Sequence, residues 1–141
     1  MTTCEPIVLS PEAQCLVIDH IQGALPGEAV GLLAGSAEGK VELVLPLPNI
    51  SKDIYFFLAD PFEQYLALRR IKSEGLRLLA IYHSHPDGGG SASALDLKYA
   101  HAWECWHLIV PVDAKRGVPK SLEAFRCLRE GGTECESVTL R

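Results

Sequence analysis

Hydrophobic and polar residues recur along the chain with two periods, one typical of helices and one typical of strands. Ser10, Pro11 and Glu12 combine a helix N-cap, a first-turn proline and a first-turn acid. Pro26-Gly27 stops the helical pattern that follows. We therefore predict a first helix between these signals, with an apolar stripe of Leu16, Val17, Ile18 and Ile21.

Two further helices are predicted by their N-terminal residues. Asp60-Pro61-Phe62-Glu63 provides an N-cap, a first-turn proline and a reciprocal acid, and Gly75 ends the helix that follows. Ser93 caps a short helix that runs to about Trp103.

The strands are predicted from apolar or alternating runs bounded by Gly and Pro. Gly39 marks a turn between the first two runs, which indicates a hairpin. The run that ends at His85 is a predicted central strand, terminated by Pro86 and Gly88–Gly90. The predicted runs are Glu28–Ala34, Val41–Leu47, Ile54–Leu58, Leu76–His85, Trp106–Val112, Leu122–Arg129 and Ser137–Leu140. Together these elements predict an α/β fold of the α+β type, with one mixed or predominantly antiparallel sheet.

Length and composition favour one domain over residues 1–141. The chain has 141 residues, of which 48% are hydrophobic, so it can bury a core without a metal ion or a disulfide. The length excludes a TIM barrel and disfavours a two-domain dinucleotide enzyme. We find no repeat and no linker that would separate two cores.

Charge and cysteine usage exclude several classes of function. With 13 basic and 18 acidic residues and no basic cluster beyond pairs, the chain is not expected to bind nucleic acid. It has neither a membrane span nor a signal peptide, so we expect a cytoplasmic protein. Its five cysteines form no C-x-x-C pair, and we expect Cys15, Cys105 and Cys127 to be small buried hydrophobes.

His83 and His85 are the first candidates for chemistry. They lie two apart on a predicted strand, so both imidazoles point from one face and can converge on one ion. Asp96 follows eleven residues after His85, in the first turn of the next predicted helix. Two histidines and one carboxylate with an open fourth position for water form the ligand pattern of catalytic zinc.

Each of these residues also has a structural alternative. The histidines could be a strand-end pair in which one is buried and hydrogen-bonded and the other is exposed. Ser93-x-x-Asp96 is also a capping box, in which the carboxylate reaches back to the backbone. Both interpretations agree that a helix begins at Ser93.

Glu28 is the candidate general base. A charge at the start of the apolar run Ala29–Ala34 is costly unless it has a partner, and a carboxylate in a dry cleft can accept and return a proton. The alternative is an exposed glutamate beside a Pro-Gly turn.

These residues resemble the JAMM metalloproteases, also called the MPN-plus or Mov34/PAD-1 domain. The family pattern is a glutamate in the first strand, then H-S-H-P, six residues and S-x-x-D. The chain has Glu28, His83-Ser84-His85-Pro86 and, after six residues, Ser93-Ala94-Leu95-Asp96. The resemblance covers most of the chain, and Tyr82 and the start of the second helix look like the short bacterial members. One departure is Ala92, where family members often have proline, after the glycine-rich turn.

The resemblance implies both a fold and a mechanism. It implies a central mixed sheet flanked by about three helices, in a layered architecture like that of cytidine deaminase. One Zn²⁺ would be bound by His83, His85 and Asp96, with water as fourth ligand, while Glu28 serves as general base and then acid. Ser93 would steady the oxyanion, and no covalent intermediate would form.

The short bacterial relatives are associated with ubiquitin-like sulfur carriers of the ThiS and MoaD type. The resemblance thus implies a zinc peptidase or isopeptidase that hydrolyses the bond after a C-terminal Gly-Gly tail. A non-catalytic MPN module that scaffolds a complex is the alternative from another class. A RadC-type relative shares the H-x-H-P and S-x-x-D pattern, but the acidic balance gives no reason to expect DNA.

Overall fold

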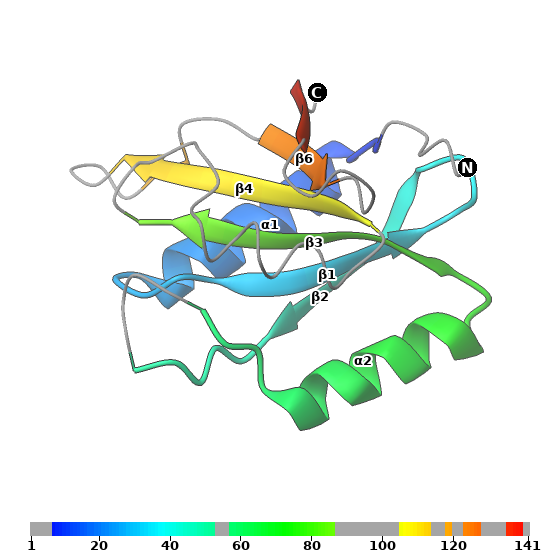
Figure 1. The fold of residues 1–141 in the computed structure, drawn as a ribbon, viewed down its shortest axis with the longest axis horizontal. Helices are drawn as coiled ribbons and strands as arrows, with labels where there is room; N and C mark the ends of the chain where they lie inside the picture. Colours follow the sequence, from blue (N-terminus) through cyan, green and yellow to red (C-terminus); the bar gives the residue numbers. More distant parts are fainter. Residues whose placement is uncertain are drawn as a thin grey trace.

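The structure is a computed structural model, which describes residues 7–52, 57–86 and 105–113, and the backbone of three short strands at 118–119, 123–127 and 135–139. Figure 1 shows a sheet with one helix against its far side and another along its lower margin. In this part of the chain neither helix is long and apolar enough to cross a membrane.

The two helices begin where their capping residues predict. Helix α1 is Pro11–Ala24, and the Ser10 side chain accepts a hydrogen bond from the Ala13 N–H at 3.1 Å. Helix α2 is Pro61–Ser73, and the Asp60 carboxylate accepts from the N–H groups of Phe62 and Glu63.

The described strands form one mixed sheet in the order β2-β1-β3-β4-β6-β7, with β5 paired to β4. Strand β1 pairs antiparallel with both β2 and β3, whereas β3 and β4 are parallel. The α+β class and the central position of β3 are therefore confirmed. The strands are β1 Val30–Gly35, β2 Val41–Leu47, β3 Arg77–His85, β4 Trp106–Asp113, β5 Val118–Pro119, β6 Glu123–Cys127 and β7 Cys135–Thr139.

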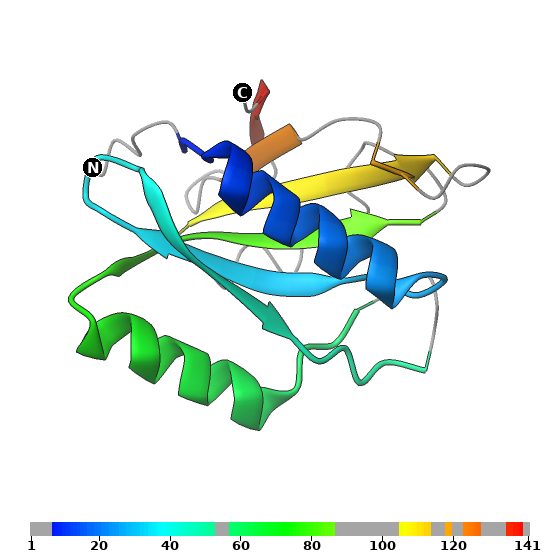
Figure 2. The ribbon, with the colours of Figure 1, turned by 180° about the vertical axis from the view of Figure 1, so that it is seen from behind.

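The sheet has a hydrophobic cluster on each face. On one face Val17 and Ile21 of α1 pack with residues such as Tyr82 and Leu108. Figure 2 shows α1 lying across this face. On the other face Ala67 and Ile71 of α2 pack with residues such as Leu32 and Ile81. Alternate residues of β3 therefore belong to different clusters.

Two expectations about α1 are wrong. Cys15 is exposed, and Leu16 is exposed although it belongs to the predicted apolar stripe. The buried positions of the helix are Ala13, Val17 and Ile21, which follow one another at four-residue spacing. Cys15 and Leu16 lie outside that stripe, because only one side of a helix faces a sheet.

Other expectations about the fold have mixed outcomes. Cys105 is buried as expected, and Trp106 lies in the core on the α1 face. The helix expected from Ser93 to Trp103, most of the run at 54–58 and the Cys127 side chain lie outside the described residues.

Gly31 leaves room for the Tyr82 ring, which lies against its backbone. A Cβ atom added at Gly31 would lie 2.3 Å from the Tyr82 ring, which is fully buried. We expect Gly31→Ala to lower the free energy of unfolding by about 1–3 kcal/mol through overpacking. Urea denaturation measures this loss.

Gly23→Ala is the matched control. An added Cβ at this α1 residue meets nothing within 4 Å, so the substitution should stabilise the helix by roughly 0.5–1 kcal/mol. If both variants unfold at the same urea concentration, the close approach at Gly31 is not a constraint.

Candidate functional site

Both predicted histidines lie near the C-terminal end of β3, beside the start of β1. Val30 of β1 pairs with His83 of β3. His83 and His85 lie on the same face, and their Nε2 atoms are 3.2 Å apart. Both side chains are buried, with exposed fractions of 3% and 8%. The alternative in which one histidine is exposed is therefore wrong.

Glu28 completes a buried cluster of three. Its side chain is 5% exposed, so the expected burial is confirmed and the exposed alternative is wrong. One ligand atom from each of Glu28, His83 and His85 lies within 4.8 Å of the others. The strand pairing brings together residues that are 55 positions apart in the sequence.

The histidine geometry fits a shared metal ion. Two imidazole nitrogens bound to one zinc at about 2.0–2.1 Å in tetrahedral geometry lie roughly 3.3–3.4 Å apart. The observed separation of 3.2 Å between the two Nε2 atoms is close to this value. The separation of the two imidazole nitrogens therefore fits two ligands of one ion, and the donor set suits zinc.

Ser84 ties the strand bearing the histidines to the residue beside Glu28. The Ala29 N–H donates to Ser84 Oγ at 2.8 Å, and the Ser84 N–H donates to the Ala29 carbonyl at 3.0 Å. Since Ser84 is fully buried and lies between the two histidines, this reciprocal pair sets the register where the site forms.

Asn49 fixes the backbone at Glu28 from the other side. Its Nδ2 group donates to the Glu28 carbonyl at 2.7 Å, and its Oδ1 accepts from the N–H groups of Ser51 and Leu58. One side chain therefore connects residue 28 to the segment between β2 and α2.

Aromatic and imidazole rings make contacts on both faces of β3 near its C-terminal end. The Phe57 and His83 rings have centroids 4.6 Å apart and are tilted by 33°, a contact that restrains the imidazole. On the opposite face the Tyr82 hydroxyl lies 2.6 Å from His20 Nδ1. Burial raises the pKa of the Tyr82 hydroxyl and lowers the pKa of the half-buried His20 imidazole.

A cavity of about 500 Å³ lies next to Glu28, between the C-terminal end of α1 and the segment after β2. Asp19 and Glu28 are the charged residues among those that line it. Glu28 therefore borders both the histidine pair and this cavity.

Ser93 and Asp96 lie outside the described residues, so their expected roles stay predictions. Sequence reasoning missed the supporting roles of Phe57, Ser84 and Asn49. The position of Ser84 inside H-S-H-P could have indicated its importance, whereas nothing in the sequence distinguishes Asn49 from other turn asparagines.

The chain is similar to several known proteins. Residues 12–128 match the family model described as prokaryotic homologs of the JAB domain. The chain is 44% identical over 98 residues to a probable TtuB-protein conjugate cleaving protease of Thermus thermophilus, covering 69% of this chain and 64% of that protein. The chain thus spans just under two thirds of the length of this relative.

A second relative and two solved structures agree with this match. A desampylase of Haloferax volcanii is 29% identical over 104 residues, covering 70% of this chain and 75% of the relative. A solution structure from Desulfitobacterium hafniense, with 29% identity, covers 96% of this chain and 92% of its own at a TM-score of 0.80. A JAB1/MPN domain protein from Archaeoglobus fulgidus, at 22% identity, shares the fold with a TM-score of 0.63, covering 95% of this chain and 96% of its own.

The Ser84 hydroxyl can be tested by its removal. Ser84→Ala leaves the buried Ala29 N–H without its acceptor, so we expect the free energy of unfolding to fall by about 1–3 kcal/mol. Chemical denaturation measures the change. Ser36→Ala removes an exposed hydroxyl 3.3 Å from the Lys40 N–H and should change stability by less than about 0.5 kcal/mol. Equal stability of both variants would contradict a structural role for Ser84.

Proposed function

The chain belongs to the family of prokaryotic homologs of the JAB domain, and from this premise we propose that it is a zinc-dependent peptidase or isopeptidase. In this proposal it acts in the cytoplasm and hydrolyses the bond after the C-terminal Gly-Gly of a ubiquitin-like sulfur carrier of the ThiS or MoaD type. The convergence of Glu28, His83 and His85 in one buried cluster carries the proposal.

The metal ligands in this proposal are His83, His85 and Asp96. The 3.2 Å separation of the two imidazole nitrogens supports the first two, and the spacing of the sequence motif supports Asp96. A zinc ion bound here would polarise the scissile carbonyl and lower the pKa of a bound water toward about 7.

Glu28 moves the proton. Its carboxylate borders the histidine pair and is buried, so it can accept a proton from the attacking water and deliver that proton to the leaving nitrogen. The water oxygen forms a bond to the carbonyl carbon, and the carbon–nitrogen bond breaks as the amine takes up the proton. Ser93 would donate a hydrogen bond to the developing oxyanion.

The proposed substrate follows from burial and from the relatives. The three site residues are almost fully buried, and a Gly-Gly tail brings its carbonyl to such a site without a side chain beside the scissile bond. The Thermus relative is named for cleaving protein conjugates, which supports a substrate in which a carrier is joined to another group.

Metal uptake distinguishes the enzyme from a non-catalytic scaffold module. We expect the purified protein to bind one zinc ion, and His85→Ala to lose that binding because one of the two converging imidazoles is gone. Metal analysis after dialysis measures the bound zinc. His20→Ala is the matched control, since His20 bonds to Tyr82 on the other side of β3 and should keep the ion. Failure of the unmodified protein to take up zinc would favour the scaffold alternative.

Hydrolysis tests the role of Glu28. Glu28→Gln should keep zinc but lower the rate of cleavage by about 10²–10⁴-fold, because an amide cannot accept the proton. The assay is mass spectrometry of a diglycine-tailed carrier extended at its C-terminus, incubated with the loaded enzyme. A carrier whose last glycine is replaced by valine is the substrate control. Unchanged turnover by the variant would refute the assigned role.

A further inference from the structure

The side of α2 that faces away from the sheet is apolar. Phe62, Tyr65 and Leu66 are 64%, 54% and 42% exposed, respectively. The residues that α2 buries against the sheet are Ala67 and Ile71. At 100° per residue, Phe62 and Leu66 lie on the side opposite these two, so the outer pole of the helix carries large apolar side chains.

Arg69 continues this outer stripe, which we define as Phe62, Tyr65, Leu66 and Arg69. The Arg69 guanidinium lies over the Tyr65 ring, 5.9 Å from its centroid. An amphipathic helix on a sheet ordinarily presents charged and polar residues at this position. Packing against the described residues therefore does not explain this apolar stripe.

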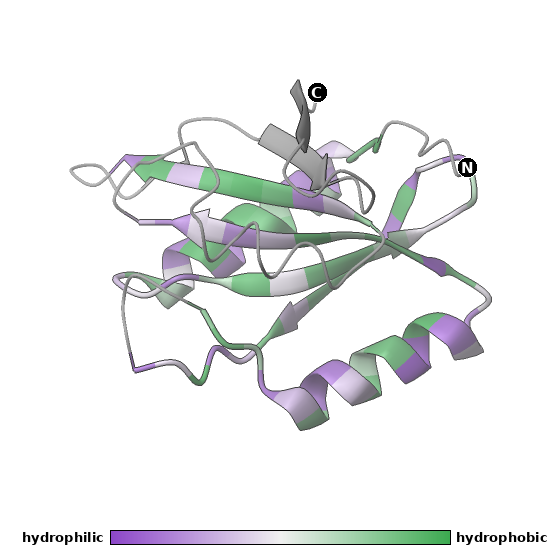
Figure 3. Ribbon diagram, in the orientation of Figure 1, coloured by the Kyte–Doolittle hydropathy of each residue, from purple (hydrophilic) through white to green (hydrophobic). Residues whose placement is uncertain are grey.

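Exposed apolar residues are concentrated here. Among the described residues seven large hydrophobic side chains are exposed, and four of them, Leu58, Phe62, Tyr65 and Leu66, lie within nine positions. Hydrophobic bands recur along the visible length of α2 in Figure 3. Figures 1 and 2 show no described element beyond α2. Clustered exposed apolar surface marks an interaction site more often than scattered exposure does.

Charges along α2 indicate which partner fits. Glu63 lies in the first turn, whereas Arg69, Arg70 and Lys72 lie in the second half of the helix. When two copies of α2 lie antiparallel, the acidic first turn of each helix therefore lies beside the basic second half of the other. We propose that the outer stripe of α2 is a self-association surface, on which a second copy of this chain docks with its α2 antiparallel.

A two-fold axis brings the charged flanks of the two helices together. Glu63 and Arg70 are seven residues apart and therefore lie on the same flank of α2. The two-fold axis of an isologous antiparallel pair runs across the helices and places like flanks together in reversed order. Glu63 of each copy then faces Arg70 of the other, while Leu66 lies near the axis.

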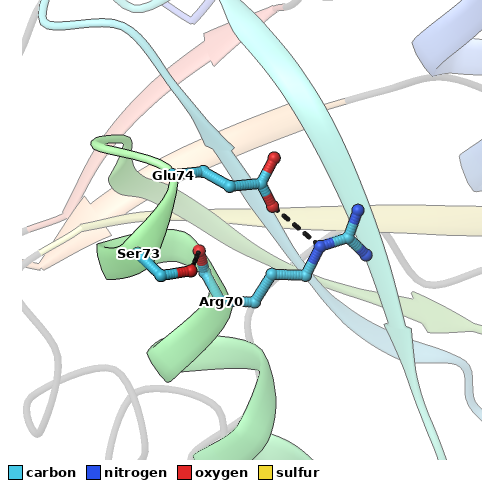
Figure 4. A network of polar contacts seen from close by, with 3 residues as sticks. All are labelled: Arg70, Ser73 and Glu74. Carbon is cyan, nitrogen blue, oxygen red and sulfur yellow. Dashed lines mark hydrogen bonds and ion pairs between the residues drawn. The ribbon is translucent and has the colours of Figure 1, made fainter.

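Arg70 can serve both its own helix and a second copy. Its Nε donates to Glu74 Oε2 at 2.8 Å on the exposed side of α2, as Figure 4 shows. That bond uses Nε, so the two terminal nitrogens of the guanidinium can donate to a carboxylate of the second copy.

The size of the stripe predicts a weak dimer. Aromatic side chains bury roughly 150–250 Å² each when fully covered. Because about half of each side chain is exposed, Phe62, Tyr65 and Leu66 together offer about 300 Å² in each copy. A standard interface buries about 800 Å² per partner, so the stripe can supply only its centre. We expect a dissociation constant on the order of 1–100 µM.

Sedimentation at several protein concentrations tests the association. The unmodified chain should shift from monomer to dimer as concentration rises through that range. Leu66→Lys should raise the dissociation constant by about tenfold or more, because it places like charges near the two-fold axis. Leu16→Lys is the matched control, an exposed leucine on α1 whose replacement should leave the dimer unchanged.

Charge reversal tests the antiparallel arrangement itself. Glu63→Arg and Arg70→Glu should each weaken the dimer, and the double variant should restore it, as should mixing the two single variants. A monomer at every concentration overturns the proposal, as does equal weakening by Leu16→Lys and Leu66→Lys. If the chain stays monomeric while Leu66→Lys raises the KM for a carrier conjugate, the stripe instead binds substrate and self-association is refuted.

Discussion

The antiparallel pairing of β1 with β3 is the contact on which the rest of the site depends. Val30 pairs with His83, and the reciprocal bonds between Ala29 and Ser84 continue the pairing by one residue. Here a hydroxyl accepts the hydrogen bond of the Ala29 N–H. A shift of one residue would turn the histidines to the opposite face and away from Glu28. The register of one strand pair therefore decides whether the three side chains meet.

Side chains of β3 alternate between the two faces of the sheet, so the supporting residues and the candidate metal ligands lie on opposite faces. Tyr82 and Ser84 point to one side of the strand, where Tyr82 is held by His20 and packs closely over Gly31. His83 points to the other side, toward Phe57. Because Tyr82 and Ser84 are fully buried, the imidazoles project from a strand that is packed in place. Asn49 adds a restraint on Glu28 from a segment outside the sheet.

Much of this arrangement was predictable from local patterns, because caps and periodicity act over a few residues. Ser10 and Asp60 begin their helices as expected, and β2 has the predicted bounds. His83 and His85 share a face as their spacing requires. The errors at Cys15 and Leu16 arose because apolar composition does not state which side of a helix meets the sheet. Only tertiary packing chooses that side.

The sequence by itself determined which chemical groups the chain offers and which local elements carry them. The H-S-H-P motif on a strand and the acid before an apolar run were both visible without a structure. Only the tertiary structure decided that Glu28 is buried beside the histidines, that Asn49 holds its backbone, and that the outer side of α2 stays uncovered by the described chain. The physical reason is the sequence distance over which each kind of interaction acts. Spacing fixes directions within one element, whereas burial and proximity depend on strands and helices that are distant in the sequence.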